Sequence, residues 1–552
     1  MRFFSDGQEM KIIRLLFEKS GKLFIMGAIA SIFTGASSAG LIALINYILQ
    51  NIEEISGGIV IGFIGLCLLL MISSAISWML LTQLSQDVIY NLRLELTQRI
   101  LACPLSQLEI LGAPKLLAAI TEDVNTIAGS SIAISSMGIN ISLVIGCLVY
   151  LCWLSVPVFI LFFVLFILGI FSYQYIANRG RAGLKTARLK QDILFEHFQT
   201  VTQGIKELKL HRQRRNAFFQ EDLKATAASV RHHWMRGMIS FAIAGGYGLG
   251  LFFIPLGILL LGLTRIMSIP SEVLTSYTLT FLYSITPLRS ILNTLPQLSQ
   301  TSVALEKIES LGLFLAEPVT EADFPTGSDF DSTWTSLELV NIHHAYRGDT
   351  EEHQFSLDNI NLKFEPGEIV FIVGGNGSGK STLVKLITGL YTPDRGQILF
   401  NNIPVTDDNR EWYRQQFSVV FYDFYLFNRL LGVDTINPTE IQNYLELLEI
   451  EHKVTVKNNI LSTTNLSQGQ RKRLALLTAY LEDRPIYVFD EWASDQDPVF
   501  KEIFYKKLLP ELKSRGKTVI AVSHDDRYFE ECDCLIKLDY GRIVENYRLA
   551  NT

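Results

Sequence analysis

The chain has 552 residues, of which 49% are hydrophobic and only 19% are charged, and its mean hydropathy is +0.26. Soluble domains carry about 25% charged residues, so this composition indicates a membrane protein and excludes a disordered chain. The formal net charge of −7 argues against a strongly basic nucleic-acid binder, and six cysteines in so long a chain argue against a disulfide scaffold.

Charged residues are missing from long stretches of the first half of the chain. The stretches without any Asp, Glu, Lys or Arg are 23–52, 55–86, 124–178 and 237–264. About 20 helical residues cross the hydrocarbon core, so 124–178 is long enough for two spans, with a turn at 155–157. A weaker span runs from Ser271 to about Pro296 and carries Arg289. The pattern predicts six membrane-spanning helices before residue 300.

The basic residues predict the orientation of these spans. Twelve Lys and Arg residues lie between the fourth and fifth spans, from Arg179 to Arg231, whereas 51–57 and 155–157 contain none. The positive-inside rule therefore places both termini and the two long loops in the cytoplasm. These loops keep a helical apolar rhythm, so we expect the spanning helices to continue below the membrane. Short elements near 104–111 and 204–210 should mark the far ends, where the C-terminal domain is the expected docking partner.

The composition changes after about residue 317. Residues 317–334 are acidic and contain Pro and Gly, as is typical of a linker. Short β-rich runs then alternate with helical patterns, which indicates an α/β domain. We therefore predict a transmembrane domain over 1–316, a linker over 317–334 and an α/β domain over 335–552.

A P-loop follows the apolar strand 369–373. The nine residues after this strand match G-x-x-x-x-G-K-[ST] and lead into a helix, which is the context that the motif requires. Backbone N–H groups of such a loop converge on the β- and γ-phosphates of a nucleotide, the lysine adds positive charge and the serine is placed to bind Mg²⁺. The residues are Gly374, Gly375, Asn376, Gly377, Ser378, Gly379, Lys380, Ser381 and Thr382.

Polar residues also end two later strands. Asp490 and Glu491 follow the strand 486–489, and His524 follows the strand 518–522. A carboxylate at such a strand end, beside a P-loop, fits a Mg²⁺ ligand, which we assign to Asp490. The next carboxylate, Glu491, can polarise the attacking water. His524 could then contact the γ-phosphate from the other side.

Residues 466–470 have the sequence LSQGQ, and the serine of this motif, Ser467, lies 23 residues before Asp490 (490 − 467). It precedes a predicted helix over 471–480. Ser467, Gly469 and Gln470 would therefore lie at a helix N-terminus, where backbone N–H groups favour an anion.

In this order, the P-loop, LSxGQ, the Asp–Glu pair and His524 resemble an ABC-transporter ATPase. With six spans ahead of it, the whole chain resembles an exporter-type ABC half-transporter. The resemblance implies a helical six-span domain of the type IV exporter fold, fused to an α/β P-loop nucleotide-binding domain. It also implies a homodimer, or a heterodimer with a similar chain, that binds ATP between the P-loop of one chain and the signature of the other. Tyr346 matches the aromatic residue that stacks on adenine, and Asp497 matches the D-loop aspartate.

The sequences 490–498 (DEWASDQDP) and 523–529 (SHDDRYF) are similar to a narrower group, the bacterial exporters of cyclic peptides and siderophore peptides of the pyoverdine and microcin type. The chain departs from the general family after 419–421, where Tyr422 replaces a glutamine that reaches Mg²⁺. We expect Asp423 or a water to substitute for it. In the signature, Gln468 replaces a glycine but leaves Ser467 and Gly469 in place.

The predicted function is therefore ATP-driven export of a peptide-like substrate across the bacterial cytoplasmic membrane. The spans carry aromatic and uncharged polar residues that suit an amphipathic peptide, and Arg289 is the only charge deep within a span. A lipid would also fit, so a lipid or lipid-linked flippase is an alternative. An exporter-fold siderophore importer and a membrane-anchored regulatory ATPase that transports nothing are the others.

Overall fold

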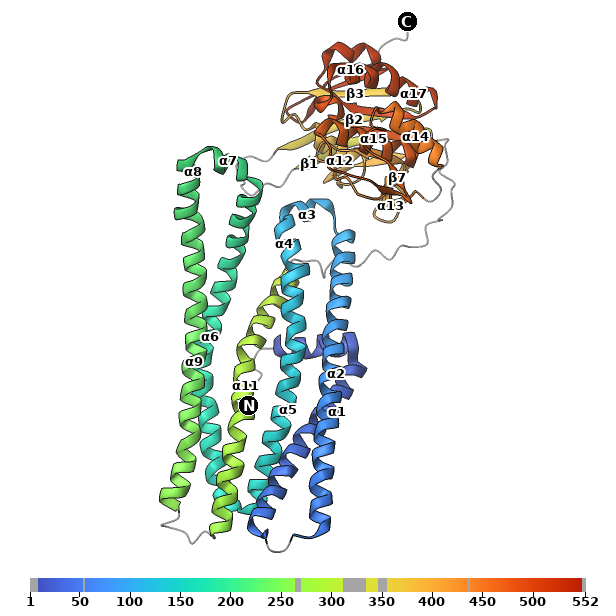
Figure 1. The fold of residues 1–552 in the computed structure, drawn as a ribbon. Coiled ribbons are helices and arrows are strands. Elements are labelled where there is room, and N and C mark those ends of the chain that lie inside the picture. The colour runs from blue at the N-terminus through green and yellow to red at the C-terminus, as the bar shows by residue number, and fades with distance from the viewer. Residues whose placement is uncertain are drawn as a thin grey trace. The chain divides into compact units, whose positions relative to one another are not determined.

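The computed structural model describes residues 8–52, 55–263, 270–310, 334–345, 355–433 and 437–548. They form two compact units, a helical one before residue 311 and an α/β one after residue 333 (Figure 1). The predicted linker lies outside the described residues apart from Trp334. The predicted domain boundaries therefore stay predictions.

Long helices dominate the first unit. They are α1 (Gln8–Gln50), α2 (Gly57–Ala102), α5 (Val124–Leu154), α6 (Val156–Gln203), α9 (Lys224–Gly257) and α11 (Ser271–Ser310). Shorter segments connect them, namely α3 (Leu105–Leu111), α4 (Ala113–Ala118), α8 (Arg212–Ala217), α7 (Ile205–Leu210) and π-helical turns at Ala119–Asp123, Phe218–Leu223 and Ile258–Leu263. Helices α3 and α7 coincide with the short elements expected near 104–111 and 204–210.

Four of the described helical stretches are long and apolar enough to cross a membrane, namely Ser20–Gln50, Gly57–Ala102, Ala113–Leu154 and Arg212–Gly262. They contain the predicted first, second, third and fifth spans. The predicted fourth and sixth spans fall in α6 and α11, which have 48 and 40 residues but are not among these four. The chain is thus a membrane protein with several apolar helices, and the count of six spans stays a prediction.

The break predicted at 155–157 is found between α5 and α6. Ser155 is extended, with φ −163° and ψ 109°, and Pro157 lies in the first turn of α6, where its missing N–H costs no helical hydrogen bond. The hydroxyl of Tyr277 on α11 lies 2.6 Å from the carbonyl oxygen of Leu151 and 2.8 Å from that of Ser155. Both carbonyl groups also accept a backbone N–H, from Ser155 and Phe159 respectively, so the Tyr277 hydroxyl adds a second contact to each and attaches α11 to the break.

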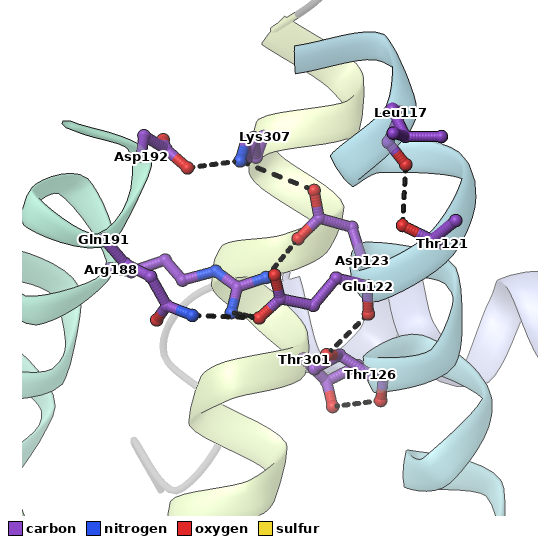
Figure 2. A network of polar contacts seen from close by, with 10 residues as sticks. All are labelled: Leu117, Thr121, Glu122, Asp123, Thr126, Arg188, Gln191, Asp192, Thr301 and Lys307. Atoms are coloured by element: carbon purple, nitrogen blue, oxygen red, sulfur yellow. Dashed lines mark hydrogen bonds and ion pairs between the residues drawn. The ribbon is translucent and has the colours of Figure 1, made fainter. Parts of the chain in front are cut away.

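An ion-pair network joins three segments of the helical unit (Figure 2). Asp123, at the end of a π-helical turn, is fully buried and accepts a hydrogen bond from Arg188 of α6. Arg188 also contacts Glu122 at 2.7 Å. From α11, Lys307 lies 3.6 Å from the second carboxylate oxygen of Asp123 and 2.7 Å from Asp192. The buried charge of Asp123 is therefore shared between two cations that come from different helices.

The second unit contains two main sheets. The antiparallel sheet has the order β2-β1-β4-β5, and the mainly parallel sheet has the order β12-β11-β3-β10-β9-β6. The strands of the first are β1 (Leu337–Ala345), β2 (Ser356–Phe364), β4 (Arg395–Phe400) and β5 (Ile403–Pro404). Those of the second are β3 (Ile369–Gly374), β6 (Phe417–Val420), β9 (Ile486–Asp490), β10 (Thr518–Val522), β11 (Cys534–Asp539) and β12 (Arg542–Arg548).

Helices and a small hairpin complete this unit. They are α12 (Lys380–Ile387), α13 (Arg410–Arg414), α14 (Pro438–Leu447), α15 (Gln468–Glu482), α16 (Pro498–Ile503), α17 (Leu509–Ser514) and the hairpin of β7 (Val456–Lys457) and β8 (Ile460–Leu461). Every residue of β9 and β10 is buried, so both faces of the parallel sheet are covered. This confirms the predicted α/β domain, and the P-loop strand β3 has a strand on either side of it, β11 and β10.

The parallel register decides where the functional residues meet. Val522 of β10 pairs with Ile372 of β3 on one side and with Asp490 of β9 on the other. Val420 of β6 pairs with Phe489 of β9. The carboxyl ends of these four strands therefore lie at one edge of the sheet, where open α/β sheets bind ligands.

Candidate ATP site

The P-loop runs from the end of β3 to the first turn of α12. Gly377 and Gly379 have φ of 77° and 103°, in the left-handed region that favours glycine. A Cβ at Gly379 would lie 2.6 Å from the ring of Phe355, so this position also lacks space for any side chain. The loop thus turns tightly enough to direct backbone N–H groups toward one point at the start of α12, which suits a phosphate group.

Lys380 folds back over this loop. Its Nζ donates to the carbonyl oxygens of Gly374 and Gly375 at 3.1 and 3.0 Å, and the side chain is buried. Burial lowers the pKa of Lys380, whereas the nearby carboxylates of Glu491 and Asp490 raise it. The ammonium group therefore lies among the strand-end acids and beside the phosphate-binding backbone.

Asp490 and Ser381 form the candidate metal site. The hydroxyl of Ser381 donates to the carboxylate of Asp490 at 3.4 Å. Asp490 is almost fully buried, and this burial raises its pKa, as do the negative charges of Glu491 and Asp423. Asp423 is exposed but lies close enough to influence Asp490. The structure thus brings together the two expected ligands and the residue expected to support them.

Glu491 and His524 contact each other directly. The Oε1 of Glu491 lies 3.0 Å from Nε2 of His524, and both side chains are partly exposed. The backbone of Glu491 is left-handed, with φ 50° and ψ 35°, which is uncommon for a residue other than glycine. A strained backbone of this kind persists only where surrounding contacts hold it.

The signature serine forms the cap expected from the sequence. Ser467 is the N-cap of α15, and its Oγ accepts from the backbone N–H of Gln470 at 3.4 Å. The side chain of Gln470 accepts in return from the backbone N–H of Ser467 at 3.3 Å. This capping box fixes the first turn of α15 while the Ser467 hydroxyl can still donate to an anion. Gly469 packs closely against the segment after β9, because a Cβ at this position would lie only 3.0 Å from the carbonyl oxygen of Asp495.

The D-loop aspartate is tied to the same helix. Asp497 caps α16 by accepting from the backbone N–H of Phe500 at 3.0 Å, and Arg473 of α15 contacts its carboxylate at 2.7 Å. The cap and the arginine lower the pKa of Asp497. Arg473 also donates to the Gln496 side chain at 3.0 Å.

Tyr346, the expected adenine contact, lies outside the described residues.

Comparisons with known proteins agree with this geometry. Residues 23–288 match the model of the ABC transporter transmembrane region, and residues 357–494 match the ABC transporter model. The ATP-binding protein SyrD of Pseudomonas syringae pv. syringae is 34% identical over 548 residues, which cover 98% of this chain and 97% of the relative. The chain belongs to the ABC transporters. It is an exporter-type half-transporter, whose ATPase domain couples ATP hydrolysis to transport.

Other ABC transporters match over different parts of the chain. An ATP-dependent lipid A-core flippase of Haemophilus influenzae is 26% identical over 94% of this chain and 91% of the relative. The alpha-hemolysin translocation ATP-binding protein HlyB of Escherichia coli is 33% identical over 38% of this chain and 31% of the relative. The relatives that match over nearly the whole chain thus include a lipid A-core flippase, whereas the similarity to the alpha-hemolysin translocation protein is confined to part of the chain.

Sequence reasoning missed two basic residues of the transporter's ATPase unit. Lys472 and Arg473 lie in the predicted helix 471–480, to which no role beyond the signature cap was assigned. Lys472 is fully buried, and only a small part of the Arg473 side chain is exposed. The signal that could have found them is the carboxyl-rich D-loop, because Asp495 and Asp497 need partners. Lys472 contacts Asp495 at 2.7 Å.

Proposed function

We propose that this half-transporter works as a homodimer and exports a peptide-like, amphipathic substrate across the bacterial cytoplasmic membrane. The observation that carries the proposal is the set of nucleotide-site residues at one sheet edge, in a chain that matches ABC transporters from end to end. The peptide substrate is supported by the D-loop and His524 sequences, which are similar to those of the peptide-exporter group.

In this proposal, the P-loop backbone and Lys380 bind the β- and γ-phosphates of ATP. Glu491 polarises the attacking water, and His524, 3.0 Å away, orients the Glu491 carboxylate and reaches the γ-phosphate. Ser467 and the first turn of α15 would cap the same phosphates from the second chain. ATP thereby favours the state in which two ATPase domains are closed, and hydrolysis removes that preference.

The residues at Asp490 fit a magnesium ion. Mg²⁺ prefers oxygen ligands and keeps several waters, so one hydroxyl and one carboxylate beside the nucleotide phosphates suffice. Ser381 and Asp490 provide these oxygens 3.4 Å apart. The ion would neutralise charge on the phosphates, and Asp423 would hold one of its waters.

A cavity in the helical unit supports an amphipathic substrate. It has a volume of about 550 Å³ and lies between α9 and α11. Its lining is mainly apolar, with Phe241 and Leu288 among the residues, and Arg289 is the one charged residue among the described lining residues. A charge at this depth is costly unless it faces a polar interior or a ligand. The lining therefore suits an apolar molecule that carries a polar or anionic group.

Reconstitution of the purified transporter into liposomes tests the proposal. We expect ATP-dependent movement of an acylated or cyclic peptide in the direction away from the ATPase side, and stimulation of ATPase activity by the same peptide. Movement toward the ATPase side would indicate an importer. ATP hydrolysis without movement of any peptide or lipid would refute transport by the isolated homodimer.

Two matched variants connect the substrate to the cavity. A Cβ at Gly246, which lines the cavity, or at Gly62 on α2, which does not, has no atom within 4 Å. Both positions thus accept a larger side chain without a backbone clash. We expect Gly246→Leu to reduce stimulation by the peptide and Gly62→Leu to leave it unchanged. Equal effects of the two substitutions would argue against this cavity.

Flipping of a lipid is the second candidate function, because three lipid A-core flippases each match 94% of the chain or more. The same liposomes distinguish the candidates. A labelled lipid that moves between leaflets with ATP, and that stimulates ATPase activity where peptides do not, would favour the flippase.

A further inference from the structure

Lys472 is the most deeply buried charged side chain near the candidate ATP site. It lies in the second turn of α15 and is 0% exposed. An isolated ammonium ion costs several kcal/mol to bury, so its position requires a full set of partners. Lys472 has them, and they come from the segment that contains Glu491.

The ammonium group of Lys472 has three acceptors for its three N–H bonds. Its Nζ donates to the backbone carbonyl oxygen of Glu491 at 2.9 Å and to Oγ of Ser494 at 3.0 Å, and it contacts the carboxylate of Asp495 at 2.7 Å. The indole N–H of Trp492 donates to the backbone carbonyl of Lys472 at 2.8 Å. The turn after β9 is therefore attached to α15 twice, because it accepts hydrogen bonds from the Lys472 side chain and donates one to the Lys472 backbone.

This attachment acts on the strained part of the site. Glu491 has a left-handed backbone, and its carbonyl oxygen also accepts from the hydroxyl of Ser494 at 2.7 Å. The carbonyl group and the side chain of Glu491 are attached to the same Cα, so a contact that holds the carbonyl limits the φ and ψ changes that would redirect the Cα–Cβ bond. By fixing the carbonyl group, Lys472 fixes the direction in which the Glu491 carboxylate leaves the backbone, while His524 contacts the carboxylate itself.

The same lysine contacts the residue that replaces the expected glutamine. Its Nζ lies 5.1 Å from the centre of the Tyr422 ring, within the range of a cation–π interaction. Tyr422 is about half exposed, so one face of its ring covers Lys472 and the rest of the side chain remains accessible. A phenol is a poor ligand for Mg²⁺, but an aromatic ring is a good partner for a buried ammonium ion.

We propose that Lys472 is a positioning residue for Glu491, and that Tyr422 acts through Lys472 rather than as a metal ligand. The inference rests on the proposed role of Glu491 in polarising the attacking water. Movement of the segment that contains Tyr422 would then change the orientation of the Glu491 carboxylate through one buried cation. The signature helix, which begins at Ser467 five residues earlier (472 − 467), belongs to the same rigid group.

The test is steady-state ATPase activity of the full-length transporter in lipid nanodiscs, with ATP affinity and thermal unfolding measured on the same samples. We expect Lys472→Met to lower kcat roughly 10- to 100-fold, because a small misplacement of a catalytic group has an effect of this size. KM and the Kd for ATP should stay within about twofold, because the contacts of the Lys472 ammonium group are with Glu491, Ser494 and Asp495 rather than with the P-loop. Lys472→Gln keeps one N–H donor for the Glu491 carbonyl and should recover part of kcat.

Lys513→Met is the matched control. Lys513 pairs with Asp533 at 2.6 Å in the same domain, but Asp533 precedes β11 and therefore lies at the opposite edge of the sheet. This variant should lose stability without losing kcat. If Lys472→Met keeps its kcat, or if kcat, affinity and thermal stability fall together as a merely structural role predicts, the inference is wrong.

The tyrosine gives a second test, which remains available if Lys472→Met does not fold. Tyr422→Phe keeps the aromatic face and should have near-normal kcat, whereas Tyr422→Leu should lose about two- to tenfold. A Phe variant as impaired as the Leu variant would show that the hydroxyl matters and would overturn this role. Glu491→Gln separates the two proposals. Normal turnover of Glu491→Gln would refute the role of Glu491 itself. Loss of turnover in Glu491→Gln together with an unchanged kcat in Lys472→Met would refute the inference about Lys472 alone.

Discussion

The ion pairs around Asp123 lead to a stability prediction for the helical unit. Arg188 is the partner whose removal should matter most, because it contacts both Glu122 and the fully buried Asp123. In Arg188→Met the side chain keeps most of its length and apolar packing but loses the charge. Among the described residues, the cation that then remains beside Asp123 is Lys307, 3.6 Å away and shared with Asp192.

The expected magnitude follows from burial. Removing one partner of a buried ion pair costs about 3–5 kcal/mol, because the remaining charge is left without compensation. Lys307 still compensates part of the Asp123 charge, so we expect a loss of about 3 kcal/mol, at the lower end of that range. Lys185, one turn before Arg188 on α6, pairs with Glu306 at 3.4 Å, and both side chains are about half exposed. Such pairs contribute about 0–1 kcal/mol, so Lys185→Met is a matched control.

The assay is unfolding of the purified protein by SDS titration, followed by far-UV circular dichroism, which reports mainly on the long helices. The double variant Asp123→Asn, Arg188→Met isolates the buried charge, because a neutral amide does not need a counter-ion. We expect it to recover more than half of the stability that Arg188→Met loses. The reasoning would be refuted if Arg188→Met cost no more than Lys185→Met, or if the second substitution recovered nothing.

Three further predictions concern the ATPase unit. Asp423→Ala should weaken Mg²⁺ binding about 10–100-fold, because a residue that supports a metal ligand is removed. Titration of ATPase activity with Mg²⁺ measures this effect, and an unchanged midpoint would exclude Asp423 from the site. Burial raises the pKa of Asp490, and only the ionised carboxylate binds Mg²⁺, so activity should fall with decreasing pH at a pH above the usual aspartate pKa of about 3.9. Added Mg²⁺ should shift this fall to lower pH, and a profile indifferent to Mg²⁺ would contradict the assignment. The exposed residues Asn376 and Ser467, each changed to cysteine, should crosslink two chains when ATP is present, whereas the absence of intermolecular crosslinks under all nucleotide conditions would argue against the proposed dimer site.

The parts of the fold that depend on local sequence could be predicted. The P-loop, the Ser467 cap and the break at Ser155 each arise within a few consecutive residues, where glycine conformations, side-chain caps and proline act directly on the backbone. Apolar runs of about 20 residues or more likewise indicated long helices. The contact between Glu491 and His524 is consistent with one further rule, that parallel strands end at the same edge of a sheet.

Contacts between distant segments were decided only by the tertiary structure. Asp123 pairs with Arg188 because the π-helical turn before α5 packs against α6 at a particular depth and rotation, and no spacing in the sequence specifies either. Lys472 follows the signature motif in a run of basic residues, yet it is buried because the segment 491–495 provides acceptors for its ammonium group. In each case a charge becomes buried when several segments supply acceptors together. A hydropathy pattern treats every charged side chain as solvent-exposed. It therefore predicts helices and strands, but it does not predict the ionic contacts between them.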